Sequence, residues 1–246
     1  MTGELTAAAV RAELAKVADA GDAVHLQRFF KTGPGEYGEG DVFIGVRVPK
    51  TRAAVKPFAG MPLAQIDLLL DSAVHEHRLA GLVILNGEMA RATRKRGADV
   101  AAQQRIVELY LAAVRRGRVN NWDLVDASAE FILGPWLLER PRGLLFELAG
   151  ADSLWERRVA LLTTFAFIKA GDTGTTVELC ERLLGDERDL IQKALGWMLR
   201  EIGKRVDPAI LTGFLDSHAP AMGRTALSYA TEHLTSEQRT HYRSLR

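Results

Sequence analysis

The sequence has 246 residues, and its 47% hydrophobic and 26% charged residues are typical of a globular protein, which excludes a fibrous or wholly disordered chain. The 32 lysine and arginine residues against 31 aspartate and glutamate residues give a net charge of +1, so no strong overall field attracts nucleic acid. No apolar run of about 18 residues could span a membrane, and we expect no secretory signal. The single cysteine, Cys180, can form no internal disulfide or thiolate metal site, which fits a reducing cytoplasm.

A glycine-rich segment runs from Lys31 to Gly40 and contains four glycines and one proline. This composition excludes a helix and predicts a surface loop. The segment lacks the Gly-Lys-Ser/Thr triplet of a phosphate-binding P-loop, so we do not expect it to bind a nucleotide. The alternation in DVFIGVRV (Asp41–Val48) predicts one short strand after the loop, and one strand cannot form a sheet.

Helical periodicity dominates the chain from about Gly60 onward. Apolar residues recur there at spacings of three and four, as in ALLTTFAFIKA, TVELCERLL, LIQKALGWMLREI and PAILTGFLDSH. The helical blocks come in pairs separated by short breakers, a pattern that favours an all-α fold and a curved α-solenoid of HEAT-like repeats. A compact helical bundle is the alternative. No linker divides the chain, so we expect a single domain over residues 1–246.

The segment WDLVDASAEFIL is predicted to form a helix that begins after the capping pair Asn120-Asn121. One apolar stripe is expected along it, made by Leu124, Val125, Ser128, Phe131 and Ile132. Trp122 and Asp126 are four residues apart and share a face about 130° from that stripe. A tryptophan and a carboxylate on this face are unusual. The alternative is that Trp122 packs on the next helix pair and Asp126 is a solvated or capping carboxylate.

The segment SLWERRVALLTTFAFI is predicted to form a helix with an arginine on its apolar side. Its apolar stripe is made by Leu154, Leu161, Leu162, Phe165 and Ile168. Arg158 falls inside this stripe and Arg157 at its edge. A buried guanidinium without a partner is costly, so Arg158 must find a carboxylate or a phosphate, or extend its stem to solvent. Arg158 could therefore form either a structural ion pair or a bidentate contact with a phosphate.

The segment DLIQKALGWMLREIGK is predicted to form a helix with two distinct stripes. The core stripe is made by Ile191, Leu195, Met198 and Ile202. The second stripe is made by Lys193, Trp197, Arg200 and Lys204. Cations interleaved with an aromatic on one face suit a polyanion that carries flat bases or sugars. A solvated basic face with one partly covered tryptophan is the alternative.

Two further basic clusters occur, RATRKR (Arg91–Arg96, with Arg94 and Lys95) and RRGR (Arg115–Arg118). Each is expected at a helix C-terminus, where cations also complement the helix dipole. The six histidines show no metal-binding spacing, and no GxSxG nucleophile motif occurs. Cys180 lies in a helical apolar pattern and is expected to be a small core residue.

Four segments, taken together, resemble the AlkD-like DNA alkylation repair glycosylases, which are built from HEAT-like repeats. The segments are FFKTGPGEYGEGDVFIGVRVP (Phe29–Pro49), NNWDLVDASA (Asn120–Ala129), LWERRVALLTTFAFI (Leu154–Ile168) and LIQKALGWMLREIGK (Leu190–Lys204). From the first to the last, they span residues 29–204, which is most of the chain. The NNWDLVD and KALGWMLREIGK blocks are the most specific.

The resemblance implies an active site made by Asp126 as the catalytic carboxylate, Trp122 and Trp197 as aromatic walls, and Arg158 as the arginine. An aromatic near the N-terminus also helps to shape such a site, and Phe30 or Tyr37 could supply it. Contacts with DNA are expected from the remaining basic residues, namely Lys193, Arg200, Lys204, Arg94, Lys95 and Arg118.

The resemblance also implies a monofunctional enzyme that removes 7-methylguanine and 3-methyladenine from double-stranded DNA and leaves an abasic site. It implies no metal and no organic cofactor. We further expect a monomer that acts in the cytoplasm on nucleoid DNA and has no membrane partner. The alternatives are a non-catalytic HEAT-like module that binds distorted DNA and a protein-interaction scaffold.

Overall fold

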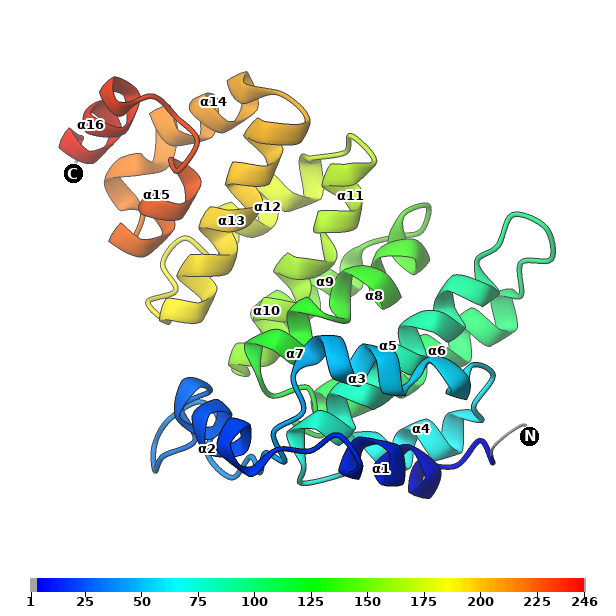
Figure 1. Ribbon diagram of the computed structural model, residues 1–246. Coiled ribbons are helices and arrows are strands. Elements are labelled where there is room, and N and C mark those ends of the chain that lie inside the picture. The colour runs from blue at the N-terminus through cyan, green and yellow to red at the C-terminus, as the bar shows by residue number, and fades with distance from the viewer. Residues whose placement is uncertain (1–3, 246) are drawn as a thin grey trace. The chain divides into compact units, whose positions relative to one another are not determined.

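The computed structural model describes residues 4–245, which form α-helices joined by loops and two short 3-10 helices (Figure 1). The elements are α1 (Ala7–Ala15), α2 (Ala20–Phe29), α3 (Val48–Ala54), η1 (Lys56–Phe58), α4 (Leu63–Leu70), α5 (His75–Ala92), α6 (Val100–Arg115), α7 (Trp122–Asp126), α8 (Ala129–Leu137), α9 (Gly143–Gly150), α10 (Leu154–Thr163), α11 (Phe165–Lys169), α12 (Gly174–Arg182), α13 (Asp189–Arg205), α14 (Pro208–His218), η2 (Ala219–Ala221), α15 (Arg224–Ala230) and α16 (Ser236–Ser244). The predicted all-α class is confirmed.

The chain divides into two compact units, Met1–Ile132 and Leu133–Arg246. In the first unit, α4, α5 and α6 lie side by side, and α1 and α3 pack on α5 (Figure 1). The central helix α5 buries residues on several sides, among them Leu82, Leu85 and Met89. Full burial of each such side chain stabilises the unit by about 1.5–3 kcal/mol.

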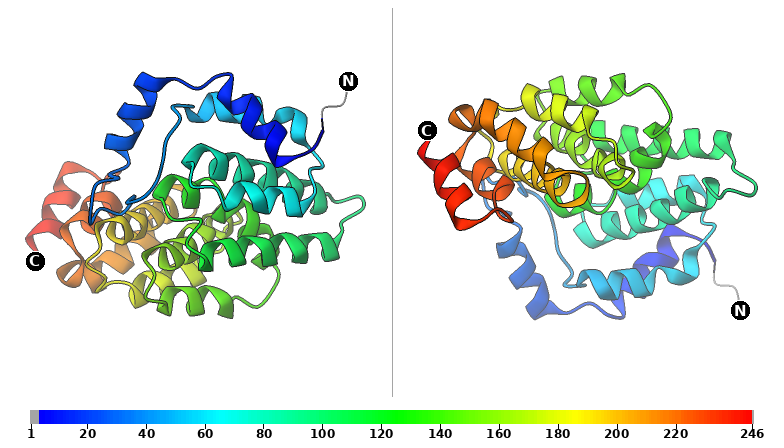
Figure 2. Two further views of the ribbon diagram at one scale, coloured as in Figure 1. Left: turned by 90° about the horizontal axis from the view of Figure 1, so that it is seen from below. Right: turned by 90° about the horizontal axis from the view of Figure 1, so that it is seen from above.

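Helix α2 differs from its neighbours because it contains no buried residue. It stands apart from the stack of α4, α5 and α6 (Figure 2). Its first turn is nevertheless fixed to the loop before α3. Gly45 there has a positive φ of 80°, and a Cβ on it would lie 1.9 Å from the carbonyl oxygen of Asp19. Only glycine allows so close an approach of the two backbones.

The second unit is organised around α13, which packs against α10, α11, α12, α14 and α15. The predicted core stripe of α13 is confirmed, because Ile191, Leu195, Met198 and Ile202 are all buried. Gly196 allows α15 to approach, since a Cβ there would lie 2.3 Å from the carbonyl oxygen of Ala226. Helices that follow one another in the chain, such as α9 and α10 or α13 and α14, also pack together, in agreement with the predicted α-solenoid. The expectation of a single domain stays a prediction.

Several local predictions were wrong in detail. The segment WDLVDASAEFIL forms two helices, because α7 ends at Asp126 and α8 begins at Ala129. Phe131 is therefore not on a buried stripe, and 45% of it is exposed. SLWERRVALLTTFAFI is likewise divided at Thr164 into α10 and α11.

The predicted strand Asp41–Val48 is reduced to a single β-bridge between Val42 and Val74. The Gly-rich segment is the predicted loop, with turns and mostly exposed residues. Cys180 is buried as predicted, and burial raises the pKa of its thiol. Within residues 4–245, no helix combines the length and apolar character that crossing a membrane requires.

Candidate functional site

The short helix α7 carries two of the predicted site residues, Trp122 and Asp126. As predicted, an asparagine caps its start, because the side chain of Asn121 accepts a hydrogen bond from the Trp122 backbone N–H at 2.8 Å. Leu124 and Val125 point into the core and are fully buried. Trp122 and Asp126 lie one turn apart on the remaining face, and both are half-buried.

The chain directly after α7 is fixed by three polar contacts. The Ser128 hydroxyl donates to the carbonyl oxygen of Leu124 at 2.6 Å and lies 3.0 Å from the hydroxyl of Tyr110. The Asn86 side chain donates to the carbonyl oxygen of Ala127 at 2.7 Å. Helices α5 and α6 thus hold this end of α7, which is too short to be stable alone.

An aromatic cluster surrounds the Trp122 ring. Phe30 stacks on it with centroids 5.3 Å apart, and Phe29 meets it edge-on at 6.1 Å. The Phe30 ring also stacks on Phe43, with centroids 5.1 Å apart. Of the two aromatic candidates near the N-terminus, Phe30 therefore contacts Trp122. Tyr37 lies in the loop, where the ammonium group of Lys31 is 6.0 Å from its ring.

Asp126 lies within electrostatic range of the buried Tyr110. Burial is the main cause that raises the pKa of Tyr110, and the charge of Asp126 adds to it. Tyr110 is therefore a neutral hydrogen-bonding group beside the carboxylate.

A buried charge network, which the sequence analysis missed, supports the other end of α7. His75 at the start of α5 lies between two carboxylates, with Nδ1 3.0 Å from Asp41 and Nε2 2.8 Å from Asp123. Arg78 donates to the second oxygen of Asp41 at 2.6 Å. No local spacing signals this network, because its members are 34 and 48 residues apart in sequence.

The charges of this network are balanced. Burial opposes protonation of His75, but Asp123 and Asp41 outweigh it and raise the pKa of the imidazole to about 9. Burial also opposes ionisation of Asp41, yet hydrogen bonds and charges from His75 and Arg78 lower its pKa. At neutral pH two cations therefore face two carboxylates.

The next residue of α5 holds the loop that carries Asp41. The buried carboxylate of Glu76 accepts hydrogen bonds from three consecutive backbone N–H groups, those of Ile44 (3.1 Å), Gly45 (2.8 Å) and Val46 (3.1 Å). A carboxylate that satisfies three backbone donors fixes this segment firmly.

In the second unit, Arg158 on α10 is buried, with 4% of its surface exposed. Its Nη1 donates to the carbonyl oxygen of Leu190, in the first turn of α13, at 2.6 Å. A backbone carbonyl is a partner that the sequence analysis did not consider. The neighbouring Arg157 makes an ion pair with Asp186 at 2.9 Å.

Trp197 lies on α13 as predicted and is half-buried. Its indole N–H donates to Glu201 one turn later at 3.3 Å, and its ring lies 5.8 Å from that of Phe165. Burial opposes ionisation of Glu201, but hydrogen bonds from Arg205 and Arg200 lower its pKa. Glu201 therefore fixes the indole orientation as a charged acceptor.

The cations predicted beside Trp197 differ in their environment. Lys193 forms an ion pair with Asp189 at 2.8 Å. Arg200 is engaged by Glu201 at 3.2 Å and by Glu232. Lys204, one turn further, is exposed. The basic stripe is thus present, but Arg200 within it already forms ion pairs with two glutamates.

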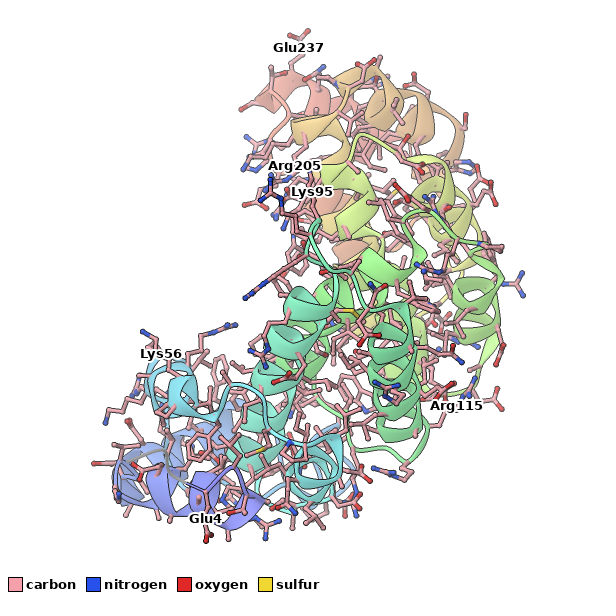
Figure 3. The ribbon with its side chains drawn as sticks, turned by 90° about the vertical axis from the view of Figure 1, so that its right-hand side faces the viewer. Glu4, Lys56, Lys95, Arg115, Arg205 and Glu237 are labelled. Atoms are coloured by element: carbon pink, nitrogen blue, oxygen red, sulfur yellow. The ribbon has the colours of Figure 1, made fainter. Side chains whose placement is uncertain are left out.

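The two other basic clusters lie at helix ends, as predicted, but not together. Arg94 and Lys95 are exposed in the loop after α5, and Arg118 follows α6 and lies 3.6 Å from Asp71. Lys95 and Arg115 lie at opposite ends of α6, a helix of 16 residues (Figure 3). Such a helix is about 24 Å long, so the clusters do not form one patch.

Within each unit, the structure brings some predicted site residues together. In the first unit, Trp122 contacts Phe30 and lies one turn before Asp126 on α7. In the second unit, Trp197, Lys193, Arg200 and Lys204 share α13, and Arg158 lies on the adjacent α10.

The chain is similar to a known protein family and to solved structures. The model of a family described as DNA alkylation repair enzyme matches residues 10–234. Among solved structures, a predicted DNA alkylation repair enzyme from Enterococcus faecalis is similar, with a TM-score of 0.66 and 19% identity over 89% of this chain and 97% of that chain. At this identity the likeness shows the fold alone. No curated protein sequence matches the chain.

Proposed function

Because this chain belongs to the DNA alkylation repair enzyme family, we propose that it is a DNA glycosylase which hydrolyses the N-glycosidic bond of cationic alkylated purines in duplex DNA. Family membership confirms the resemblance inferred from the sequence and places the chain in DNA alkylation repair. The substrates are 7-methylguanine and 3-methyladenine, and the product is an abasic site in an unbroken strand.

One observation carries the proposal: α7 holds a half-buried indole and a half-buried carboxylate one turn apart. Both ends of α7 are fixed, by Asn121 at its start and by Asn86 and Tyr110 beyond its end. A carboxylate fixed before the reaction stabilises developing positive charge without reorganising. This arrangement suits catalysis better than a merely solvated acid would.

The substrate determines what the protein must supply. A guanine methylated at N7 or an adenine methylated at N3 is already cationic in DNA and leaves without a general acid. The barrier lies in the positive charge that develops on the deoxyribose as the glycosidic bond breaks. Asp126 would stabilise that charge and orient the attacking water, and the face of Trp122 would add a cation–π interaction of about 0.5–2 kcal/mol.

Residues of the second unit would complete the reaction. Trp197 would provide the second aromatic wall, and Arg158 would hold a phosphate next to the lesion. The remaining basic residues would contact the DNA backbone, namely Lys193, Arg200, Lys204, Arg94, Lys95 and Arg118. No lysine joins the proposed catalytic set, so Schiff-base chemistry and strand cleavage are not expected.

The test is release of 7-methylguanine from methylated duplex DNA under single-turnover conditions. Asp126→Asn should slow release on the order of 10²–10³-fold, the usual cost of removing one preorganised electrostatic group, and leave DNA affinity intact. Glu108→Gln, an exposed carboxylate on α6, is the matched control and should keep the wild-type rate.

Two results would contradict the proposal. A wild-type rate in Asp126→Asn would remove this residue from catalysis. Salt-dependent DNA binding with no base released by the wild-type protein would favour a non-catalytic DNA-binding module instead.

A further inference from the structure

The buried network of the first unit connects α5 directly to the residue beside Trp122. Asp123 follows Trp122 on α7, and its carboxylate accepts from His75 Nε2 at 2.8 Å. The opposite ring nitrogen of His75 faces Asp41 at 3.0 Å. Both ring nitrogens therefore donate, and only 2% of the side chain is exposed, so no solvent competes for either contact.

A second contact joins His75 to the Trp122 ring through an intermediate ring. Phe30 contacts the His75 ring in a tilted arrangement with centroids 5.1 Å apart, and it stacks on Trp122 with centroids 5.3 Å apart. Phe30 is 94% buried, so it has little freedom to move. His75 is thus linked to Trp122 in two ways, through its hydrogen bond to Asp123 on α7 and through the Phe30 ring.

We propose that His75 is a positioning residue which, through Asp123, holds α7 in the orientation that presents Trp122 and Asp126 to damaged DNA. This inference rests on the proposed function and assigns to His75 no contact with substrate.

The physical reason is the length of α7. Five residues form a single turn, which does not persist without external support. The end of α7 is held by neutral hydrogen bonds, whereas its first turn is held by a charge-assisted one, which is shorter and roughly twice as strong. Loss of this contact would leave the largely buried Asp123 carboxylate without its cation and favour rotation of the helix toward solvent.

Two substitutions at this position separate positioning from general stability. The amide nitrogen of His75→Gln can occupy the place of Nε2 and keep a donor toward Asp123. The amide nitrogen of His75→Asn can occupy the place of Nδ1 and keep only the donor toward Asp41. Both variants remove the charge, so they should lose similar stability in urea denaturation. His77→Gln, on the same turn of α5, is the control and should keep the wild-type excision rate.

The single-turnover excision rate then distinguishes a positioning role of His75 from a role in general stability. His75→Asn should lose on the order of 10²-fold, the effect of misplacing reacting groups by about 1 Å, while His75→Gln stays within about threefold of wild type. Equal losses in both variants, or a loss in neither, would overturn the inference. If His75→Asn does not fold, Asp123→Ala takes its place, because it removes the acceptor and so breaks the same contact from the α7 side.

A measurement without catalysis distinguishes this inference from the proposed function. In a chain whose other tryptophans (Trp136, Trp155 and Trp197) are replaced by phenylalanine, acrylamide quenching reports on Trp122 alone. His75→Asn should raise its quenching constant and His75→Gln should not, even if the wild-type protein releases no base. Identical quenching in both variants would overturn the positioning role.

Discussion

Phe30 stacks on Trp122 with ring centroids 5.3 Å apart and ring planes 27° from parallel. Phe30 directly follows α2, and Trp122 is the first residue of α7. The stack joins the N-terminal segment to the helix that carries the proposed catalytic carboxylate. Phe29, the preceding residue, meets the same indole edge-on but is 55% exposed.

The two phenylalanines should therefore differ in their contribution to stability. Phe30→Ala should lower the free energy of unfolding by about 3–5 kcal/mol, since it leaves a cavity among buried rings. Phe29→Ala should cost at most about 1 kcal/mol, because most of its ring already faces solvent. Urea denaturation of both variants measures the difference. Equal effects would show that the stack contributes nothing specific.

Two glycines with similar backbone angles provide a second test. Gly45 and Gly35 have φ values of 80° and 76°, but only at Gly45 would a Cβ collide with backbone, whereas at Gly35 nothing lies within 4 Å. Gly35→Ala should cost about 1–2 kcal/mol, the penalty of the left-handed conformation alone. Gly45→Ala should cost clearly more, because the loop after Asp41 must separate from α2. Similar denaturation midpoints would contradict this account.

The raised pKa of His75 predicts a specific loss of stability at alkaline pH. Its pKa is about 9 in the folded protein and 6.5 in the unfolded chain, so the folded state binds the proton more tightly. The stabilisation is complete below pH 6.5 and is lost as pH rises through 9. The free energy of unfolding of the wild-type protein should fall over this range more steeply than that of His75→Gln. Parallel pH profiles of the two proteins would exclude an imidazolium at this position.

The lowered pKa of His77 predicts a loss of stability at acid pH, whereas the raised pKa of His75 predicts one at alkaline pH. Burial, with smaller effects from Arg11 and Arg78, lowers its pKa to about 4. Its neutral form therefore stabilises the fold above pH 6.5, and this contribution is lost as pH falls through 4. Replacing His77 with glutamine should flatten the acid side of the stability profile. A profile unchanged between pH 4 and 6.5 would contradict the shift.

DNA binding should depend on the exposed end of the basic stripe. Lys204→Ala should lower the slope of log affinity against log salt by about 1, as expected for one lost phosphate contact. Lys16→Ala, an exposed lysine at the end of α1, is the control and should leave the slope unchanged. Arg200→Ala should change the slope less than Lys204→Ala, since Glu201 and Glu232 already engage Arg200. An unaltered slope in Lys204→Ala would remove this lysine from the DNA interface.

The sequence by itself determined the features that depend on neighbours along the chain. Periodicity gave the helical class and the buried stripe of α13, and the asparagine pair gave the start of α7. A spacing of four placed Trp122 and Asp126 on one face, because one turn of helix brings such residues together. Helix breaks at Thr164 and after Asp126 escaped prediction, since both segments keep a helical apolar pattern through the break.

Only the tertiary structure decided which side chains support these residues. Asp41, His75 and Asp123 come from three distant segments, and no spacing rule relates them. The fold brings Asp41 and Asp123 to His75, and these carboxylates outweigh the effect of burial and keep the imidazole charged, because charges removed from water must find partners wherever the fold places them. The same requirement gave Arg158 a backbone carbonyl in the first turn of α13 that local patterns had not indicated.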